Sequence, residues 1–235
     1  MNHAPRTNRL SVTHDRMLTM LNTSGRCLIW IGLLLLLIGC TTVGNQIHPT
    51  TLHKNLTLQP GALPQHGVAF LTPSTVTGQE QDQQAVALIF AEHMRAQLPA
   101  VRVISLPESL GAINRAGLAP EYRKMVEDYR ETGIFPREIL TKVGRAIGTR
   151  YLIQLKLAAF SQDMRERISI FGVRLFQTLH ANIRLYMQIW DAEAGTIAWE
   201  GSEELSYAYD SSAEMPVTFR RVVEEAAQQL IQNLP

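Results

Sequence analysis

The chain has 235 residues, with 22 lysines and arginines against 21 aspartates and glutamates, and a formal net charge of +1. Basic and acidic residues are mixed along the chain. This mixture predicts no continuous basic patch that could follow a phosphate backbone, so nucleic acid is a poor candidate for a partner of the protein. The histidines are scattered without helical or finger-like spacing, and we therefore expect no metal site.

The first notable element is an apolar run from Cys27 to Gly39, preceded by Arg26 and free of charge. It is about a dozen residues long, well short of the roughly 20 that a helix needs to span a bilayer. A basic start, a short apolar core and small residues at the end are typical of a secretory signal peptide. We interpret residues 1–39 as that signal peptide and leave them out of the fold.

The run ends in a four-residue motif, Leu37-Ile38-Gly39-Cys40, that resembles the bacterial lipobox. The resemblance implies that the Cys40 thiol takes a diacylglyceryl group and that the chain is cut before it. The alternative is an uncleaved anchor with an incidental cysteine. Thr41 stands where lipoproteins kept at the inner membrane of many Gram-negative bacteria carry aspartate, so we expect the outer membrane and its periplasmic face.

The start of translation is open, because Met17 and Met20 would give shorter basic regions than Met1. Removing residues 1–39 takes away four arginines and one aspartate, which leaves 18 basic and 20 acidic residues and a net charge of about −2. The mature chain keeps a single cysteine, Cys40, so a disulfide within it is excluded.

Two regions follow the signal peptide. Residues 40–66 are polar, contain prolines and glycine and show no period, so we predict a lipid-anchored flexible tether. Residues 67–235 are long enough to form one well-cored domain.

Within this domain, apolar periodicity predicts alternating strands and helices. In chain order we expect a strand at 67–71, a helix at 82–98, a strand at 101–106, a helical region at 108–147 broken at 117–120 and 133–136, a strand at 151–157, an apolar stretch at 168–176, a strand at 179–190, a hairpin connection at 191–195, a strand from 196 towards 209, and a helix at 216–234. We expect Gly148 to end the helical region and Gly195 to provide a positive φ in the hairpin. The fold class is α/β (α+β): one mixed, largely antiparallel sheet covered by helices, with a βαβ-like start and a C-terminal helix.

Two segments carry a family resemblance, ILTKVGRAIGTRYLIQLKL at 139–157 and LYMQIWDAEAGTIAWEGSEE at 185–204. Their order resembles the anticodon-binding-domain-like fold of bacterial envelope lipoproteins. Examples are the curli secretion lipoprotein, the activators of penicillin-binding proteins and the amino-terminal domain of the Tol-system propeller protein. The resemblance covers residues 67–235. It implies a fold and brings no catalytic residues.

The strand at 179–190 offers the candidate site. Arg184, Tyr186 and Gln188 share one of its faces, and Tyr and Arg are favoured at protein interfaces. Two interpretations stay open: a surface that binds a partner, or a face beneath a covering helix. Trp190 and Trp199 flank the hairpin, and we expect a cross-strand aromatic contact between them rather than a ligand platform.

Catalytic motifs such as G-x-S-x-G and S-x-x-K are missing from the sequence. We therefore predict no catalytic residue and no cofactor other than the covalent lipid on Cys40. The predicted function is a non-enzymatic lipoprotein of the cell envelope that binds another envelope protein or peptidoglycan, in an oligomeric state that the sequence leaves open.

One segment supports an alternative function. In the curli secretion family, extra hairpins between sheet strands become membrane-spanning strands of an oligomeric pore, and such a hairpin needs two alternating strands of about ten residues. Residues 160–180 offer one apolar stretch, interrupted by Gly172, so we favour a long loop or an extension of the sheet. A pore or secretion-channel subunit is the second hypothesis, and a lipid-anchored hydrolase is a distant third.

Overall fold

The computed structural model describes residues 45–170, 173–211 and 218–235. These residues form seven strands and six helices in one mixed sheet with helical cover. In chain order the elements are β1 (Asn45–Asn55), α2 (Ala62–His66), β2 (Val68–Phe70), β3 (Ser74–Thr75), α3 (Glu80–Gln97), β4 (Val103–Ile104), α4 (Leu106–Arg115), α5 (Ala119–Thr132), α6 (Arg137–Ile147), β5 (Tyr151–Ile170), β6 (Val173–Asp191), β7 (Thr196–Ser211) and α7 (Phe219–Gln232).

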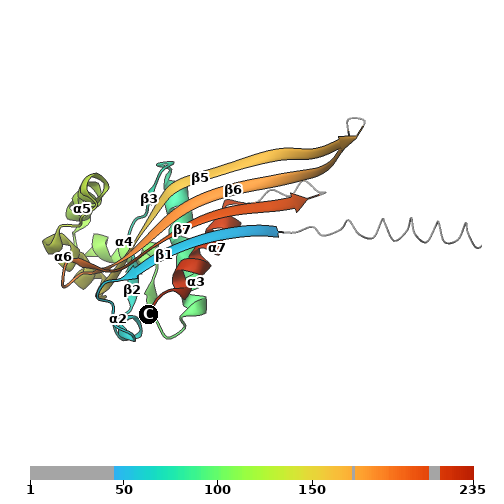
Figure 1. Cartoon of the computed structure of the whole chain (residues 1–235). Helices are drawn as coiled ribbons and strands as arrows, with labels where there is room; N and C mark the ends of the chain where they lie inside the picture. Colours follow the sequence, from blue (N-terminus) through green and yellow to red (C-terminus); the bar gives the residue numbers. More distant parts are fainter. Residues whose placement is uncertain (1–44, 171–172, 212–217) are drawn as a thin grey trace, which may run out of the picture. The chain divides into compact units, whose positions relative to one another are not determined.

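The strands lie in the order β1-β7-β6-β5-β2-β4, and β3 pairs with β5. Strands β1, β7, β6 and β5 pair with one another in antiparallel fashion, whereas β2 is parallel to β4 and β5, and β3 is parallel to β5. Figure 1 shows the long strands β1, β7, β6 and β5 side by side. The predicted fold class, a mixed and largely antiparallel sheet with a closing helix, is confirmed.

The predicted βαβ-like start is also confirmed, because β2 and β4 pair in parallel with α3 between them. β4 is shorter than expected. Ser105 caps α4 there: its hydroxyl and backbone N–H lie 2.6 and 2.7 Å from the Glu108 carboxylate, in a capping box. The capping box and the adjacent Pro107 start a helix immediately after Ile104, so the strand ends.

One face of the sheet packs against α3 and α7 and holds the larger core (Figure 1). The alternation along β6 predicts this face correctly: every second residue points into the core and is at most 3% exposed. These residues are Ala181, Ile183, Leu185, Met187 and Ile189. Trp199 of β7 is fully buried in the same core.

Described helices cover the other face at one end. Helices α4, α5 and α6 pack there over β2 and the ends of β5 and β6, around Leu140, Phe135 and Trp190. Trp190 therefore lies on the opposite face from Trp199. The predicted contact between the two tryptophans is wrong, because the register shifts between Ile189 and Trp190 and pairs Trp190 with Ile197.

Two glycines make the turns that position this end of the sheet. Gly148 ends α6 with φ +81°, and Gly195 closes the β6–β7 turn with φ +74°. Both values lie in the left-handed region that favours glycine. Both roles agree with the prediction from sequence.

The predicted tether is wrong for most of its length. Residues 45–55 form β1, which pairs with β7 along all eleven residues, and α2 follows. Leu58 and Leu63 are 1% and 3% exposed within the larger core. An edge strand needs one partner and tolerates the polar residues and Pro49 that make this segment resemble a linker. Residues 1–44 lie outside the described residues, so the prediction for 40–44 is not tested.

The segment that we predicted as a loop or sheet extension is an extension. β5 and β6 pair with each other up to Ile170 and Val173. The last β6–β7 pair is Gln177 with Ser211, so the β5–β6 hairpin continues beyond the end of β7 (Figure 1). The apolar stretch predicted at 168–176 is therefore divided between the ends of two strands.

Candidate functional site

The candidate residues lie on the part of the sheet that no described helix covers. Because side chains alternate along a strand, the residues that point away from α3 and α7 form rows across β1, β7, β6 and β5. One row runs through Leu52, Ser202, Tyr186 and Lys156, which are paired in register. We call this surface the open face.

The next row on the open face contains an ion pair. Arg184 Nε lies 2.6 Å from Glu204 Oε1, and both side chains are about half exposed, at 48% and 54%. Beyond it, the Ser206 hydroxyl donates to Asn182 Oδ1 at 2.8 Å. An exposed ion pair stabilises a fold by at most about 1 kcal/mol. These groups are therefore available to a partner at little cost to the domain.

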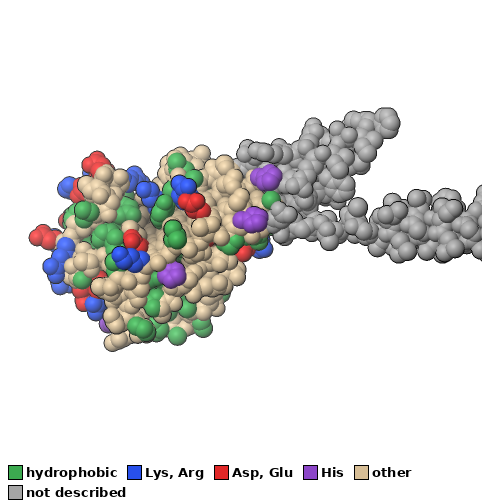
Figure 2. Space-filling model, viewed as in Figure 1, with side chains coloured by type: hydrophobic (Ala, Val, Ile, Leu, Met, Phe, Trp, Pro, Cys, Tyr) green, Lys and Arg blue, Asp and Glu red, His purple; other side chains and the backbone are tan. Residues whose placement is uncertain are grey.

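Apolar side chains are exposed beside these polar pairs. Leu52 is 68% exposed and Tyr186 is 39% exposed. Charged, apolar and uncharged polar side chains are interspersed on the side of the molecule drawn in Figure 2, and acidic and basic side chains gather near α5 and α6. The mixture of an aromatic, an aliphatic and a guanidinium group is typical of the centre of a protein interface.

Two shallow hollows shape the open face. One, of about 410 Å³, includes His48, Arg184 and Glu204 in its lining. The other, of about 280 Å³, includes Leu52 and Tyr186. Both are open depressions on a flat sheet, and the open face therefore suits a macromolecular surface better than an enclosed small molecule.

The structure shows where the predicted residues lie relative to the described helices, and their role as a partner surface stays a prediction. Arg184 and Tyr186 lie on the open face, with no described helix over them. Gln188 lies at its border, where its Oε1 accepts hydrogen bonds from Tyr129 at 3.0 Å and from Trp190 at 3.2 Å. Because both hydrogen bonds fix its amide, Gln188 is a poor contact for a partner. It holds Tyr129 of α5, which forms a wall at this border of the open face.

That wall is an aromatic cluster. Tyr129 stacks on Phe135 with ring centroids 4.4 Å apart, and Phe135 meets Trp190 edge to face at 5.0 Å. Burial raises the pKa of Tyr129, so its hydroxyl stays protonated and donates to Gln188. The wall is rigid and limits the open face on one side.

The β1 residues of the open face were missed by the sequence analysis. His48, Thr50, Leu52 and Lys54 alternate with the side that contains Ile47 and Thr51. Along β1, Leu52 is the exposed apolar residue on one side, and Ile47 is the partly buried apolar residue on the other. An alternation that rests on two apolar residues is too weak to predict a strand from the sequence.

A buried carboxylate lies behind the open face. Glu203 is fully buried, and its Oε2 accepts a hydrogen bond from the Thr51 hydroxyl at 2.5 Å. Among the residues that the structure describes, its Oε1 finds no hydrogen-bond partner. Burial raises the pKa of Glu203, and the Thr51 hydrogen bond opposes this rise only in part. The Thr51–Glu203 hydrogen bond therefore joins β1 to β7 through a carboxyl group whose protonated form is favoured by burial.

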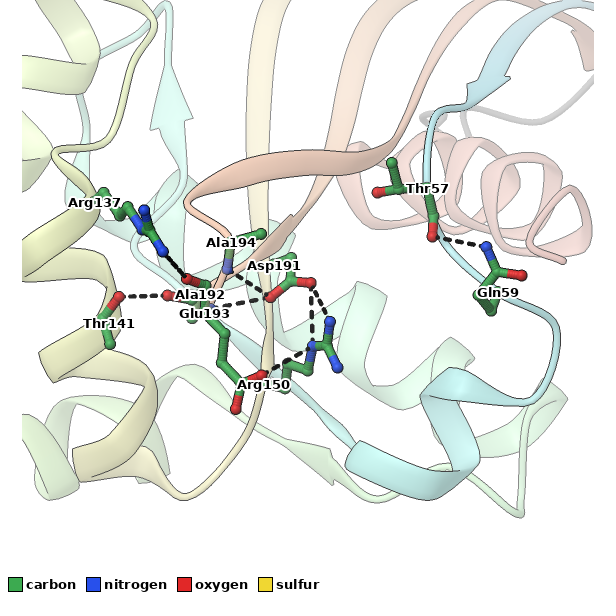
Figure 3. Close-up of polar contacts among 9 residues, drawn as sticks. All are labelled: Thr57, Gln59, Arg137, Thr141, Arg150, Asp191, Ala192, Glu193 and Ala194. Atoms are coloured by element: carbon green, nitrogen blue, oxygen red, sulfur yellow. Dashed lines mark hydrogen bonds and ion pairs between the residues drawn. The ribbon is translucent and has the colours of Figure 1, made fainter.

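The β6–β7 turn is held by a second set of polar contacts (Figure 3). Arg150 donates to Asp191 Oδ2 at 2.7 and 3.1 Å, while the N–H groups of Glu193 and Ala194 donate to Asp191 Oδ1 at 3.0 and 3.2 Å. The Thr141 hydroxyl of α6 donates to the carbonyl of Ala192. Burial alone would raise the pKa of Asp191, but these hydrogen bonds outweigh it and lower the pKa.

Other predictions fall outside this region. Leu37, Ile38, Gly39 and Cys40 lie outside the described residues, so lipidation stays a prediction. Within residues 45–170, 173–211 and 218–235, no group of three His, Cys, Asp or Glu side chains is placed to hold a metal ion. No helix of these same ranges is long and apolar enough to cross a membrane.

No protein-family model matches the chain, and no curated protein matches it. Among solved structures, the chain is similar to the PelC dodecamer of Paraburkholderia phytofirmans, at 13% identity and a TM-score of 0.42, over 80% of this chain and 95% of that one. It is also similar to the LpoB C-terminal domain of Salmonella enterica (13% identity, TM-score 0.32, 59% and 81% covered). A lipoprotein of Neisseria meningitidis gives 13% identity, a TM-score of 0.35 and coverage of 72% and 99%.

Likenesses at this level assign no activity or partner to the chain. The resemblance to anticodon-binding-domain-like lipoproteins stays a prediction from the two sequence segments. The functional argument therefore depends on the open face and on the residues before β1.

Proposed function

We propose that the chain is a non-enzymatic lipoprotein, anchored through Cys40 in the outer membrane, whose periplasmic domain binds another envelope protein through the open face. One observation carries the proposal: four strands present a surface without described helical cover, on which Tyr186 and Leu52 are exposed beside the Arg184–Glu204 pair. Exposed apolar and aromatic groups within a polar rim are a mark of protein interaction sites.

The size of the open face sets the strength of this binding. The open face spans three strand spacings, from β1 to β5, and six residue steps along β6, from 182 to 188. These correspond to about 15 by 20 Å between Cα positions. A standard interface buries about 800 Å² on each partner. The open face is smaller than that, so we expect weak, reversible binding. Confinement to one membrane compensates, because a shared surface raises the effective concentration of the two partners.

Few residues of sequence separate the predicted anchor from the domain. Only residues 41–44 separate Cys40 from the start of β1, and the five steps to Asn45 span at most about 18 Å. The long flexible tether expected from the sequence would let the domain sample a wide volume. Four residues instead limit how far the first residue of β1 can lie from the lipid-bearing Cys40 of the proposal.

The pore hypothesis is the second candidate, and the β5–β6 hairpin is the observation that favours it. This hairpin continues past the end of β7, as a membrane-spanning hairpin would. We place it second because, within the described residues, the extension is two-stranded beyond Ser211, and two strands with open edges would leave backbone groups unpaired in lipid. Only assembly into a closed ring would remove those edges.

Photocrosslinking in intact cells tests the binding proposal. A benzophenone amino acid at Tyr186 or Leu52 should give a discrete adduct with an envelope protein. The matched control is Leu88, which is 49% exposed on α3, on the opposite side of the sheet. Equal adducts from all three positions, or none from Tyr186 and Leu52, would contradict the open face as the binding surface.

The anchor has its own test. Cys40→Ser should abolish labelling with palmitate and leave an unprocessed precursor, because no other thiol lies in the motif. Normal labelling of that variant would remove the lipobox assignment while leaving the crosslinking result intact.

A further inference from the structure

A separate hollow, of about 390 Å³, lies where the β6–β7 turn meets α6. Basic side chains from four places in the chain line it: His66 at the end of α2, Arg102 before β4, Arg145 in the last turn of α6, and Arg150 before β5. Among its lining residues, Glu193 is the one carboxylate. We call this hollow the basic pocket.

The three arginines are held to different degrees. Arg150 bonds to Asp191 at 2.7 Å, and its Nε lies 3.5 Å from Glu193 Oε2. Arg102 donates to the carbonyl of Gly148 at the end of α6. Arg145 is exposed and makes no ion pair within the ranges that the structure describes. A guanidinium carries five N–H donors, so Arg102 and Arg145 each have donors that remain available.

The charges leave an excess of positive potential in a concave place. Asp191 and Glu193 carry two negative charges against the three arginines Arg102, Arg145 and Arg150, so one net positive charge remains around the hollow. A concave site with an excess of one sign of charge attracts ions of the opposite sign. Planar guanidinium groups match the paired oxygens of a carboxylate or a phosphate.

We propose that the basic pocket binds an oxyanion, the carboxylate or phosphate group of a ligand in the periplasm. Nothing in the binding role of the open face requires this pocket. The pocket lies at the turn end of the sheet, where Asn55 pairs with Trp199 near the start of β7, whereas the predicted anchor precedes Asn45 at the other end.

The oxyanion could come from two sources, a lipid headgroup or a soluble or cell-wall molecule, and the length of β1 bears on which of them we expect. An eleven-residue strand is about 35 Å long, so the anchor end and the turn end of β1 differ by that length. Given the lipid anchor of the proposed function, the chain is connected to its membrane attachment through the Asn45 end of β1, the end of this strand farther from the pocket. We therefore expect acidic groups of soluble or cell-wall molecules to occupy it rather than lipid phosphates.

Calorimetric titration of the full chain in non-ionic detergent tests the proposal, with inorganic phosphate and glutarate as probes at constant ionic strength. Both should bind, and binding should weaken as sodium chloride is raised from about 50 to 200 mM. Arg145→Gln should weaken binding about tenfold, as expected for the loss of charged hydrogen bonds. Arg145→Lys should give an intermediate loss, because the charge stays and the fork is removed.

The matched control is Arg123→Gln, on an exposed α5 residue outside the pocket, and it should bind as the unmodified chain does. Circular dichroism verifies that each variant is folded. No binding of either probe, or equal binding by Arg145→Gln and the unmodified chain, would overturn the proposal. Vesicles containing phosphatidylglycerol are the probe for a lipid phosphate. Arg145-dependent binding to these vesicles, together with no binding of the free anions, would show that the source is the lipid and not a soluble or cell-wall molecule. Palmitate labelling and crosslinking are independent of these results.

Discussion

Gly201 lies directly against the ring of Trp199. A Cβ atom at position 201 would come 2.5 Å from Trp199 Cη2 and 3.0 Å from Leu230 Cδ2 of α7. Trp199 and Leu230 are both fully buried. The absence of a side chain at this one position of β7 lets α7 pack on the sheet over the tryptophan.

We therefore expect Gly201→Ala to lower the free energy of unfolding by about 1–3 kcal/mol, the usual cost of overpacking a rigid core. Urea denaturation followed by tryptophan fluorescence measures it. The control is Gly111→Ala in α4, where the new Cβ would meet only the flexible Arg115 guanidinium at 3.3 Å and alanine favours the helix. Equal midpoints for the two variants would contradict the packing argument.

Glu203 should make stability depend on pH. Its pKa is raised by burial, so the folded state binds a proton more tightly than the unfolded chain, whose glutamates titrate near 4.5. Stability is therefore highest below that value and falls as the pH rises from there through the raised pKa of the folded state. Glu203→Gln should remove this fall, and urea midpoints between pH 4 and 8 measure it. An unchanged pH slope in the variant would show that another group is responsible.

Asp191 should act in the opposite direction. Its pKa is lowered, so its contribution is present above the unfolded value of about 3.8 and is lost as the pH falls through the lower folded value. At neutral pH we expect Asp191→Asn to cost about 1.5–3 kcal/mol, the range for hydrogen bonds to a charged group. The half-buried Asp128→Asn, in a surface ion pair with Lys124, serves as control, with a cost below about 0.5 kcal/mol. A small loss at Asp191 as well would mean that the turn does not need its carboxylate.

Local patterns predict much of this fold. Alternation along β6 identifies the buried row that ends at Ile189, and helix-ending glycine identifies Gly148, because both effects act between residues close in sequence. Tertiary pairing is less accessible. β1 is polar and carries Pro49, and its strand conformation depends on pairing with β7 about 150 residues later.

The candidate site shows the same division. Alternation places Arg184 and Tyr186 on one face, but whether a helix covers that face depends on where α5 ends relative to the sheet. Gln188 lies on the same predicted row and is nevertheless held by Tyr129, a contact across 59 residues of sequence. Next to Trp190, the register shift leaves Ala198 of β7 as an extra residue, which turns the Trp199 ring to the other side from Trp190, and no local pattern predicts that shift.

The corrected boundary leads to a prediction about truncation. A chain starting at Asn45 keeps β1, whereas one starting at Gly67 loses that strand together with the buried Leu58 and Leu63. Each buried leucine contributes about 1.5–3 kcal/mol, and removal of β1 exposes the edge of β7. We expect the shorter chain to unfold at lower urea concentration by several kcal/mol and to aggregate. Equal stability of the two chains would show that residues 45–66 do not contribute to the domain and act as a tether.

The chain that starts at Asn45 also separates a binding module from a pore subunit. The rows that face α3 and α7 are buried, and a domain of this size buries about 70% of its unfolded surface. We therefore expect it to stay in solution without detergent, to elute as one small species in size-exclusion chromatography with light scattering, and to unfold cooperatively. A pore subunit would need lipid for the β5–β6 hairpin and would aggregate, or form rings once detergent is added. Detergent-dependent rings would favour the channel over the module, because closure into a ring is what would pair the open edges of the extension.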